Sequence, residues 1–364
     1  MNTLMKTCAI TFLTLLVISC GGGSGDDESS AQGSNYGGYD DNSSDDNSSD
    51  AGEGLFVEVA VWGKQSESED SLGGGYGSGS GYGTGSGYGG DDSSDSSDGE
   101  AGTFNNPNGI AIDSKGFVYV TEFSGNRVQK FNTDGEVISQ WGTSGSANGE
   151  FNNPTGIAID SFDNVYISES GNDRVQKFTS DGEWLATFGE QGNEDGQFVS
   201  AMVIALDYLD NIYVTDWGNN RVQVFDSAGI YQKSIGEEGS LQGQFTNPTG
   251  IKIDINDTIW VVDRGNHRVQ KFGLDGVVIE TIGSTGTAAG EFQSPTSINF
   301  DSLGNFYISE VGNSRVQVFD ETGTVLGEVA PGVLNNPHGL VFDSEGFLYV
   351  TDTGNSVVRK FQRK

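Results

Sequence analysis

The chain has 364 residues, of which 34% are hydrophobic, and its formal net charge is −34. About half of that charge lies before residue 101, yet the rest of the chain still carries 34 acidic and only 16 basic side chains. Nucleic-acid binding depends on Lys and Arg that displace counterions from phosphates, so the charge argues against nucleic acid as a partner. A protein, a peptide or a glycan remains as the expected ligand.

The N-terminal residues 1–19 match a secretory signal peptide. One base, Lys6, precedes an apolar run that ends at Ile18 and is too short to cross a bilayer. The sequence Val-Ile-Ser-Cys that ends at Cys20 resembles a bacterial lipobox, in which the cysteine is lipidated and becomes the first mature residue. We expect this lipid to be the membrane contact and to place the protein at the outer membrane or the cell surface. The alternative is an ordinary signal peptide followed by a chance cysteine.

Cysteine and low-complexity segments limit the chemistry of the mature chain. The only other cysteine, Cys8, lies inside the expected signal peptide, so no disulfide framework or catalytic thiol is expected.

Residues 20–53 and 64–100 consist largely of Gly, Ser and Asp, with Tyr in the second segment. They lack the apolar content that offsets chain ordering, so we expect a disordered tether and a disordered insertion.

A repeat of 47 residues organises the rest of the chain. It is most visible in a series of five equally spaced arginines, and a parallel series of prolines is interrupted once, by Ala201. The last unit begins five residues early because the loop before it is shorter. Residues 101–364 therefore contain six units. The arginines are Arg127, Arg174, Arg221, Arg268 and Arg315.

Each unit contains four short segments rich in β-branched and aromatic residues, which predict strands. In the first unit they span 109–113, 117–121, 127–131 and 136–141. The third and fourth are joined through Asp134-Gly135, a pair typical of tight hairpins. No segment shows a sustained period of 3.6 residues, so we expect almost no helix.

Four antiparallel strands per repeat predict an all-β fold, a six-bladed β-propeller in which neighbouring blades bury one another's faces. An open β-solenoid is the alternative. The last unit ends after its third strand, and residues 54–63 resemble a fourth strand because they end in Trp62-Gly63. We therefore expect this N-terminal strand to complete the last blade and close the ring; otherwise it is a stray apolar patch.

The residues from Asn106 to Asp113, together with those from Val118 to Glu122 and from Asn126 to Phe131, resemble the NHL repeat. This resemblance implies a propeller, but its relatives range from binding and sensor domains to RNA-binding proteins, ubiquitin-ligase-associated proteins and a peptide-amidating lyase. The chain lacks the clustered Cys and His of a RING domain. With His267 and His338 as its only histidines, it also cannot form the three-histidine metal site of the lyase-like enzymes.

Residues kept in nearly every repeat are expected to serve folding. An acidic residue precedes each repeated arginine by five positions, and we interpret the two as an ion pair that orders a loop; a catalytic role for the carboxylates is the alternative. The last unit has Val357 at the arginine position and Arg359 nearby. The expected pairs are Glu122–Arg127, Glu169–Arg174, Asp216–Arg221, Asp263–Arg268 and Glu310–Arg315, with Asp352 as the sixth acidic residue.

Residues that differ between the repeats are expected to carry the function. Alternating strand directions place the loop between strands two and three at the same end as the interblade loop, so both should surround one mouth of a central channel. Within these positions the candidate binding face consists of Phe123, Trp217, Arg264, His267, Val311, Thr353, Met202 and His338. The alternative is that these are ordinary loop residues.

The sequence thus predicts a monomeric, lipid-anchored propeller that acts outside the cytoplasm as a binding or scaffold module for a protein, peptide or glycan. No nucleophile–base pair can be assembled from its motifs, so an enzyme is the less favoured interpretation. That alternative is a metal-dependent lyase or hydrolase with its site in the channel. We expect no cofactor, and a divalent cation held in the channel belongs to the alternative.

Overall fold

Each repeat folds into one antiparallel sheet of four strands, as its alternating apolar pattern predicts. The computed structural model describes residues 54–63 and 99–364, which belong to one structural unit. The expected signal peptide, Cys20, the tether and residues 64–98 of the insertion lie outside the described residues.

The six sheets follow one another along the chain with the same strand order. The first contains β2 (Pro107–Ile112), β3 (Val118–Glu122), β4 (Arg127–Phe131) and β5 (Val137–Trp141). The second contains β6 (Pro154–Ile159), β7 (Val165–Glu169), β8 (Arg174–Phe178) and β9 (Trp184–Phe188). The third contains β10 (Ala201–Leu206), β11 (Ile212–Asp216), β12 (Arg221–Phe225) and β13 (Tyr231–Ile235). The fourth contains β14 (Pro248–Ile253), β15 (Ile259–Asp263), β16 (Arg268–Phe272) and β17 (Val278–Ile282). The fifth contains β18 (Pro295–Phe300), β19 (Phe306–Glu310), β20 (Arg315–Phe319) and β21 (Val325–Glu328). The sixth contains β22 (Pro337–Phe342), β23 (Leu348–Asp352), β24 (Val357–Arg363) and β1 (Phe56–Trp62).

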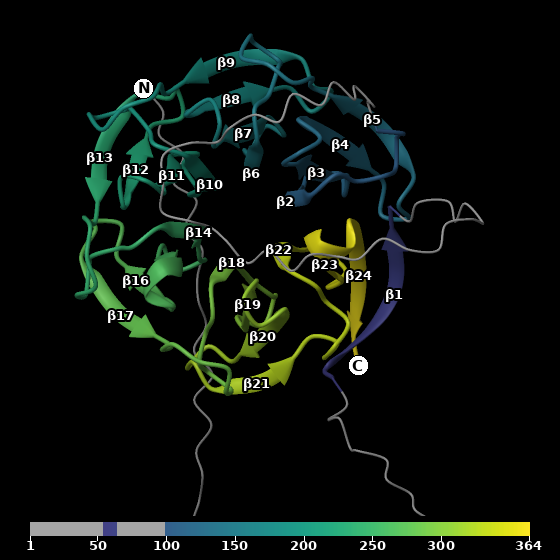
Figure 1. Ribbon diagram of the computed structural model, residues 1–364, viewed down its shortest axis with the longest axis vertical. Helices are drawn as coiled ribbons and strands as arrows, with labels where there is room; N and C mark the ends of the chain where they lie inside the picture. Colours follow the sequence, from purple (N-terminus) through teal and green to yellow (C-terminus); the bar gives the residue numbers. More distant parts are fainter. Residues whose placement is uncertain (1–53, 64–98) are drawn as a thin grey trace, which may run out of the picture. The chain divides into compact units, whose positions relative to one another are not determined.

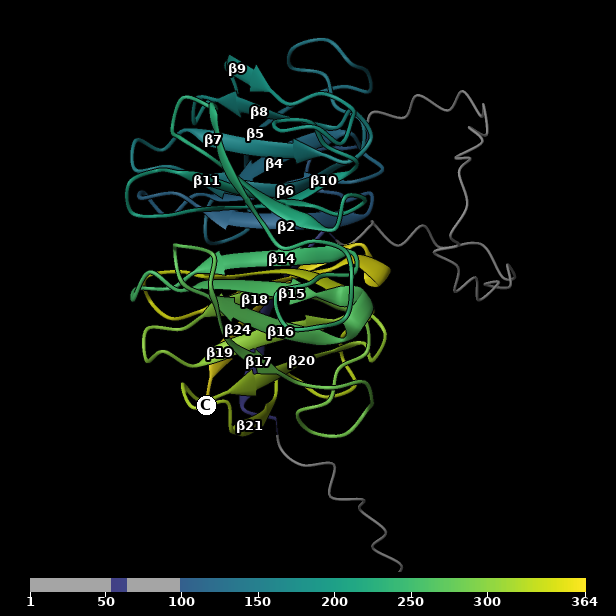
Figure 2. The same cartoon turned by 90° about the vertical axis from the view of Figure 1, so that its left-hand side faces the viewer.

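The sheets form a ring, which makes the fold a six-bladed β-propeller (Figure 1); Figure 2 shows the same propeller from the side. The first strand of each blade faces the centre, and the fourth strand lies at the rim. The buried core is divided into six clusters, and each cluster draws its side chains from two neighbouring blades. Val118 of the first blade, for example, shares a cluster with Tyr349 of the last. Packing between blades therefore supplies the burial that a single sheet lacks.

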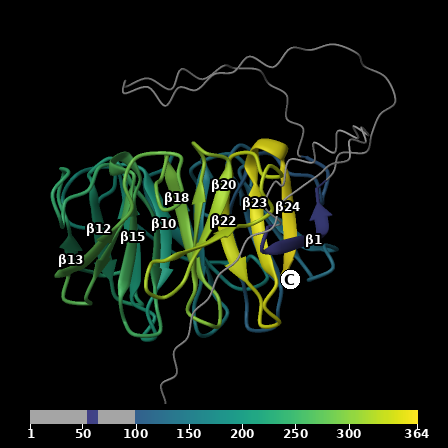
Figure 3. The same cartoon turned by 90° about the horizontal axis from the view of Figure 1, so that it is seen from below.

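The sixth blade combines strands from opposite ends of the chain. Strand β1 runs antiparallel to β24, with Phe56 opposite Arg363 and Trp62 opposite Val358 (Figure 3). The Trp62 ring lies 5.6 Å from the ring of Phe131 in the first blade. A strand in this position covers an edge that β24 would otherwise present to other chains.

The strands depart from the predicted ranges at their starts. The first strand begins at Pro107 instead of Gly109, because Pro107 still pairs with Glu122 before the register shifts ahead of Ile110. Proline is tolerated at the first residue of a strand, where its missing N–H is not needed. Helix is limited, among the described residues, to the 3-10 turns η1 (Arg264–Asn266) and η2 (Thr353–Asn355). Over those same residues no helix has the length and hydropathy to span a membrane.

Candidate ligand-binding channel

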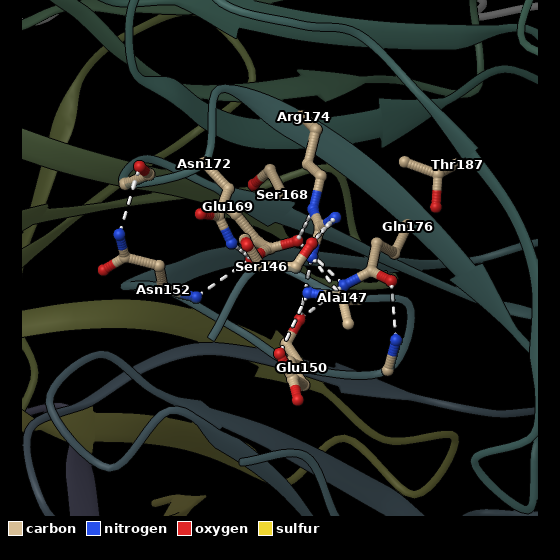
Figure 4. A network of polar contacts seen from close by, with 12 residues as sticks. Ser146, Ala147, Glu150, Asn152, Ser168, Glu169, Asn172, Arg174, Gln176 and Thr187 are labelled. Atoms are coloured by element: carbon tan, nitrogen blue, oxygen red, sulfur yellow. Dashed lines mark hydrogen bonds and ion pairs between the residues drawn. The ribbon is translucent and has the colours of Figure 1, made fainter. Parts of the chain in front are cut away.

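The repeated carboxylate and arginine form one buried network in each of the first five blades. In the second blade the Glu169 carboxylate accepts hydrogen bonds from Arg174 Nε at 2.6 Å and from Gln176 Nε2 at 2.8 Å (Figure 4). The guanidinium of Arg174 also donates to the carbonyls of Ser146 and Ala147 in the preceding interblade loop. The network therefore fastens each interblade loop to the blade that follows it.

The same ion pair recurs around the ring. Glu122–Arg127, Glu169–Arg174 and Glu310–Arg315 each measure 2.6 Å, Asp263–Arg268 measures 2.7 Å and Asp216–Arg221 measures 2.8 Å. The sixth blade has Val357 at the arginine position, and Arg359, two residues later, pairs with Asp352 at 2.5 Å and also with Glu58 of β1. All six carboxylates are fully buried, and each is paired with an arginine of its own blade, as buried charges usually are.

The two loop sets predicted to share one end of the propeller do so. Pro107, at the start of the first strand, lies opposite Glu122, at the end of the second. The next residue, Phe123, donates its N–H to the carbonyl of Asn106 in the interblade loop at 2.9 Å. Each blade thus carries both variable positions to the same rim of the channel.

The first strands enclose a cavity of about 220 Å³ in the centre of the ring. All six residues that follow the repeated proline position line it, as does one residue that follows a repeated carboxylate, Arg264. Three residues of the candidate binding face, Met202, Arg264 and His338, therefore meet at the cavity. The six residues are Asn108, Thr155, Met202, Thr249, Thr296 and His338.

The electrostatics of this lining differ from those of the whole chain. None of the described residues that line the cavity is acidic, although the chain carries a net charge of −34. Burial, and secondarily the positive charge of Arg264, lower the pKa of His338 to about 4. At neutral pH His338 is therefore uncharged, and its Nδ1 lies 3.4 Å from the amide nitrogen Nδ2 of Asn108. Since that amide can only donate, Nδ1 accepts and Nε2 carries the proton.

The other members of the candidate binding face do not line the cavity. Phe123, Trp217 and Val311 are half-buried, and each donates its backbone N–H to an interblade loop. Thr353 donates its hydroxyl to the carbonyl of Pro107, across the junction between the last and first blades.

His267 occupies a repeated structural position that sequence reasoning placed on the face. Its backbone has φ of 54°, and its Nδ1 accepts a hydrogen bond from the N–H of Ser294 at 3.0 Å. Asn126 and Asn220 have the same left-handed backbone and bond the equivalent N–H groups of Asn153 and Asn247. The imidazole of His267 thus replaces an asparagine amide in a hydrogen bond between blades.

A lysine inside the channel was missed because the search for variable residues stopped at the loops. Lys252 lies within β14 and lines the cavity, and burial lowers its pKa. The same comparison of repeats would have found it, since the first three blades have alanine at this position. The six residues are Ala111, Ala158, Ala205, Lys252, Asn299 and Val341.

The donor set of the channel does not fit a divalent cation. Calcium and magnesium require carboxylate and other oxygen ligands, whereas the charged groups here are Lys252 and Arg264. Across the described part of the chain, no group of three or more His, Cys, Asp or Glu side chains is arranged to hold a metal ion.

Comparison with known families agrees with this architecture. The family model of the virginiamycin B lyases matches residues 104–360, which include all six repeats. The chain belongs to the virginiamycin B lyase family. The NHL-like repeats predicted a propeller, and the structure shows one. The family whose model matches is that of the virginiamycin B lyases. No curated protein sequence matches this virginiamycin B lyase family member.

Solved structures with the same fold include proteins of several kinds. A catalytically inactive His-to-Ala variant of virginiamycin B lyase from Staphylococcus aureus, with quinupristin, is 17% identical, covers 70% of this chain and 80% of its own, and has a TM-score of 0.52. A gluconolactonase from Xanthomonas campestris is 16% identical, with coverages of 72% and 87% and a TM-score of 0.55. A protein of unknown function from Bacteroides thetaiotaomicron is 19% identical, with coverages of 71% and 70% and a TM-score of 0.57. At these identities the likeness concerns the fold.

Proposed function

We propose that the protein is a lipid-anchored binding module of the bacterial envelope, built on NHL-like repeats, that takes part of a protein, peptide or glycan ligand into its channel. The observation that supports this most directly is the meeting of Met202, Arg264 and His338 at one cavity. These residues are not repeated between blades, whereas the ion-pair network that fastens the interblade loops is repeated. Concave sites with a few convergent polar groups are where ligands usually bind.

Variants of the channel test the binding role. The full chain captures ligands from an envelope extract, and each capture is compared with that by Arg264→Ala and by the rim variant Trp184→Ala. Trp184 is 41% exposed on the outer strand β9, so its loss leaves the channel intact. We expect Arg264→Ala to lower ligand recovery about tenfold or more, as loss of a hot-spot arginine does. Equal recovery by all three proteins would refute the proposal.

The extent of the face can be mapped with Trp217→Ala. Trp217 lies on the same rim as Arg264 but does not line the cavity. A ligand that covers the whole rim would lose affinity in this variant, whereas a ligand confined to the channel would bind it as well as the unaltered chain.

The membrane anchor rests on the sequence that ends at Cys20. A lipidated protein fractionates with membranes and incorporates a labelled fatty acid, and the Cys20→Ala variant should do neither. Membrane fractionation and labelling that persist in this variant would contradict the anchor.

A lyase activity is the second candidate function, favoured by the family match over residues 104–360. Quinupristin, the compound that accompanies the Staphylococcus aureus structure, is the natural probe. Chromatography of quinupristin incubated with the full chain would reveal a new product if this candidate is right. The absence of acidic residues among the described channel lining favours the binding role.

A further inference from the structure

The unrepeated lysine inside the ring lies deeper than the loops of the channel mouth. Lys252 is opposite Trp260 in the register of β14 and β15, three residues beyond Thr249 at the mouth. At about 3.3 Å per residue, this places it roughly 10 Å into the channel. A long basic side chain at this position replaces the alanine of the first three blades.

Lys252 is unusual among the interior lysines because no partner compensates its charge. Lys177 pairs with Asp160 at 3.0 Å, and Lys271 with Glu280 at 2.6 Å. Asn299, the equivalent of Lys252 in the next blade, donates its amide to the carbonyl of Leu340 at 2.7 Å. Within the described part of the chain, Lys252 has no counter-ion or hydrogen-bond acceptor. A charged amine in such a place is costly unless something pairs with it.

The rest of the cavity lining reinforces this positive charge. Arg264 and His338 are the other titratable residues that line it, and His338 is neutral above a pH of about 4. The cavity thus combines two basic side chains, Lys252 and Arg264, with no acidic residue among its described lining, inside a strongly acidic protein. Such a site attracts an anion and excludes the cations that the outer surface favours.

The cavity's size restricts what can enter it. Its volume of about 220 Å³ is below the roughly 300–1,000 Å³ of most ligand pockets. Thr155, Thr249 and Thr296 line the mouth, where their buried hydroxyls donate hydrogen bonds to backbone carbonyls of the next blade. A small molecule fits this volume, as does the end of a longer one.

We propose that the channel is a carboxylate-binding site in which the Lys252 ammonium pairs with the acid group of a small carboxylic acid or of the acidic end of a larger ligand. This assignment rests on the proposed function and narrows its ligand to acidic molecules. The chemistry required is an anionic oxygen group, which a phosphate also supplies, so the test includes both.

The test follows the Lys252 amine itself. Lysines of the full chain are labelled with isotope-enriched methyl groups, and the Lys252 signal is assigned by its absence in Lys252→Met. Lactate is the carboxylate probe, lactamide its uncharged counterpart and inorganic phosphate the alternative anion. Because an anionic partner favours the charged amine, lactate should move the Lys252 signal and raise its pKa, and lactamide should do neither. A larger response to phosphate would replace the carboxylate by a phosphate, and no response to either anion would overturn the site.

Binding measured by calorimetry supplies the second readout. A charge-assisted hydrogen bond contributes roughly a 10- to 100-fold effect, so Lys252→Met should weaken lactate binding by about this factor. Lys115→Met is the matched control, since Lys115 is exposed in a loop and pairs with Asp163 at 3.8 Å. Equal lactate affinity in the three proteins would contradict the proposal.

The two proposals fail in different ways. If Arg264→Ala leaves ligand capture unchanged while lactate still shifts Lys252, the proposed function is wrong and the carboxylate site stands. If capture depends on Arg264 but neither anion shifts Lys252, only the carboxylate site is wrong.

Discussion

The ion-pair network and the channel lining come from the same repeats, yet they are built on opposite rules. The network is kept in blade after blade, and each of its carboxylates is buried and saturated with hydrogen bonds. The lining changes from Ala111 in the first blade to Lys252 in the fourth, and its lysine has no partner among the described residues. The residues kept in every blade serve the fold of each blade, whereas Lys252, which occurs in one blade, is a candidate for binding a ligand in the channel.

The largest expected effect is the loss of one buried carboxylate from the network. Glu169→Ala leaves the Arg174 guanidinium buried without its partner and should lower the free energy of unfolding by about 3–5 kcal/mol. Glu183→Ala, at an exposed position in the same blade, should change it by less than about 0.5 kcal/mol. Denaturant unfolding measures the free energy of unfolding of both variants. Similar losses in the two would contradict the prediction that the buried carboxylate stabilises the fold far more than the exposed one.

The strand that joins the chain's ends should matter almost as much. Trp62 is 6% exposed and packs against rings of the first and last blades, so Trp62→Ala should cost about 3 kcal/mol or more. Val59, on the same strand, is 45% exposed, and Val59→Ala should cost little. If thermal melting shows the same small loss for both, β1 does not close the ring.

A substitution of Lys252 in the channel should raise the free energy of unfolding, whereas the substitutions above lower it. Lys252→Met removes a desolvated charge, so it should raise the free energy of unfolding by about 1 kcal/mol, the usual size of a stabilising change at a functional site. Because the folded state lowers the pKa of Lys252, its charge costs most below that pKa. The cost falls as pH rises and vanishes above the unfolded pKa of about 10.4.

The pH dependence therefore distinguishes this explanation from improved packing. The stability gap between Lys252→Met and the unaltered chain should close at alkaline pH. A gap that stays constant over the whole range would indicate that the methionine merely packs better.

The smallest expected effect lies at the channel mouth. Arg264→Ala removes the weaker of the two causes that lower the pKa of His338, whereas burial, the stronger cause, remains. The pKa should therefore rise from about 4 but stay below the ordinary 6.5. Titration of the imidazole by NMR measures this, with Lys115→Met as the unaffected control. An unchanged value would show that Arg264 does not act on the channel.

The fold could be predicted because the repeat exposes its own period. Five arginines 47 residues apart mark five units and Pro337 marks the sixth, while the Asp134-Gly135 hairpin and its counterparts fix the strand order. Strand ends were less predictable, since Pro107 pairs beyond the apolar run that marks the strand.

The site could be predicted only in part. Comparing repeats singled out Met202, Arg264 and His338, and the structure places all three at one cavity. It could not show that His267 serves a hydrogen bond between blades, because a histidine replaces asparagine there without any change in the loop. It also overlooked Lys252, because only the loops were compared, although the change from alanine to lysine within the inner strand marks this residue in the sequence.

The central claim is that repeated residues hold the ring together and unrepeated residues bind the ligand. Arg221→Ala and Lys252→Met, each measured for melting temperature and for lactate affinity, test it most directly. Arg221→Ala should lower the melting temperature, because the Arg221 guanidinium donates hydrogen bonds to Asp216 and to the loop before its blade. This variant should leave lactate affinity unchanged. Lys252→Met should weaken lactate binding by roughly 10- to 100-fold without lowering the melting temperature. The account would be contradicted if each variant had both a lower melting temperature and a weaker lactate affinity. It would also be contradicted if Arg221→Ala weakened only lactate affinity and Lys252→Met lowered only the melting temperature.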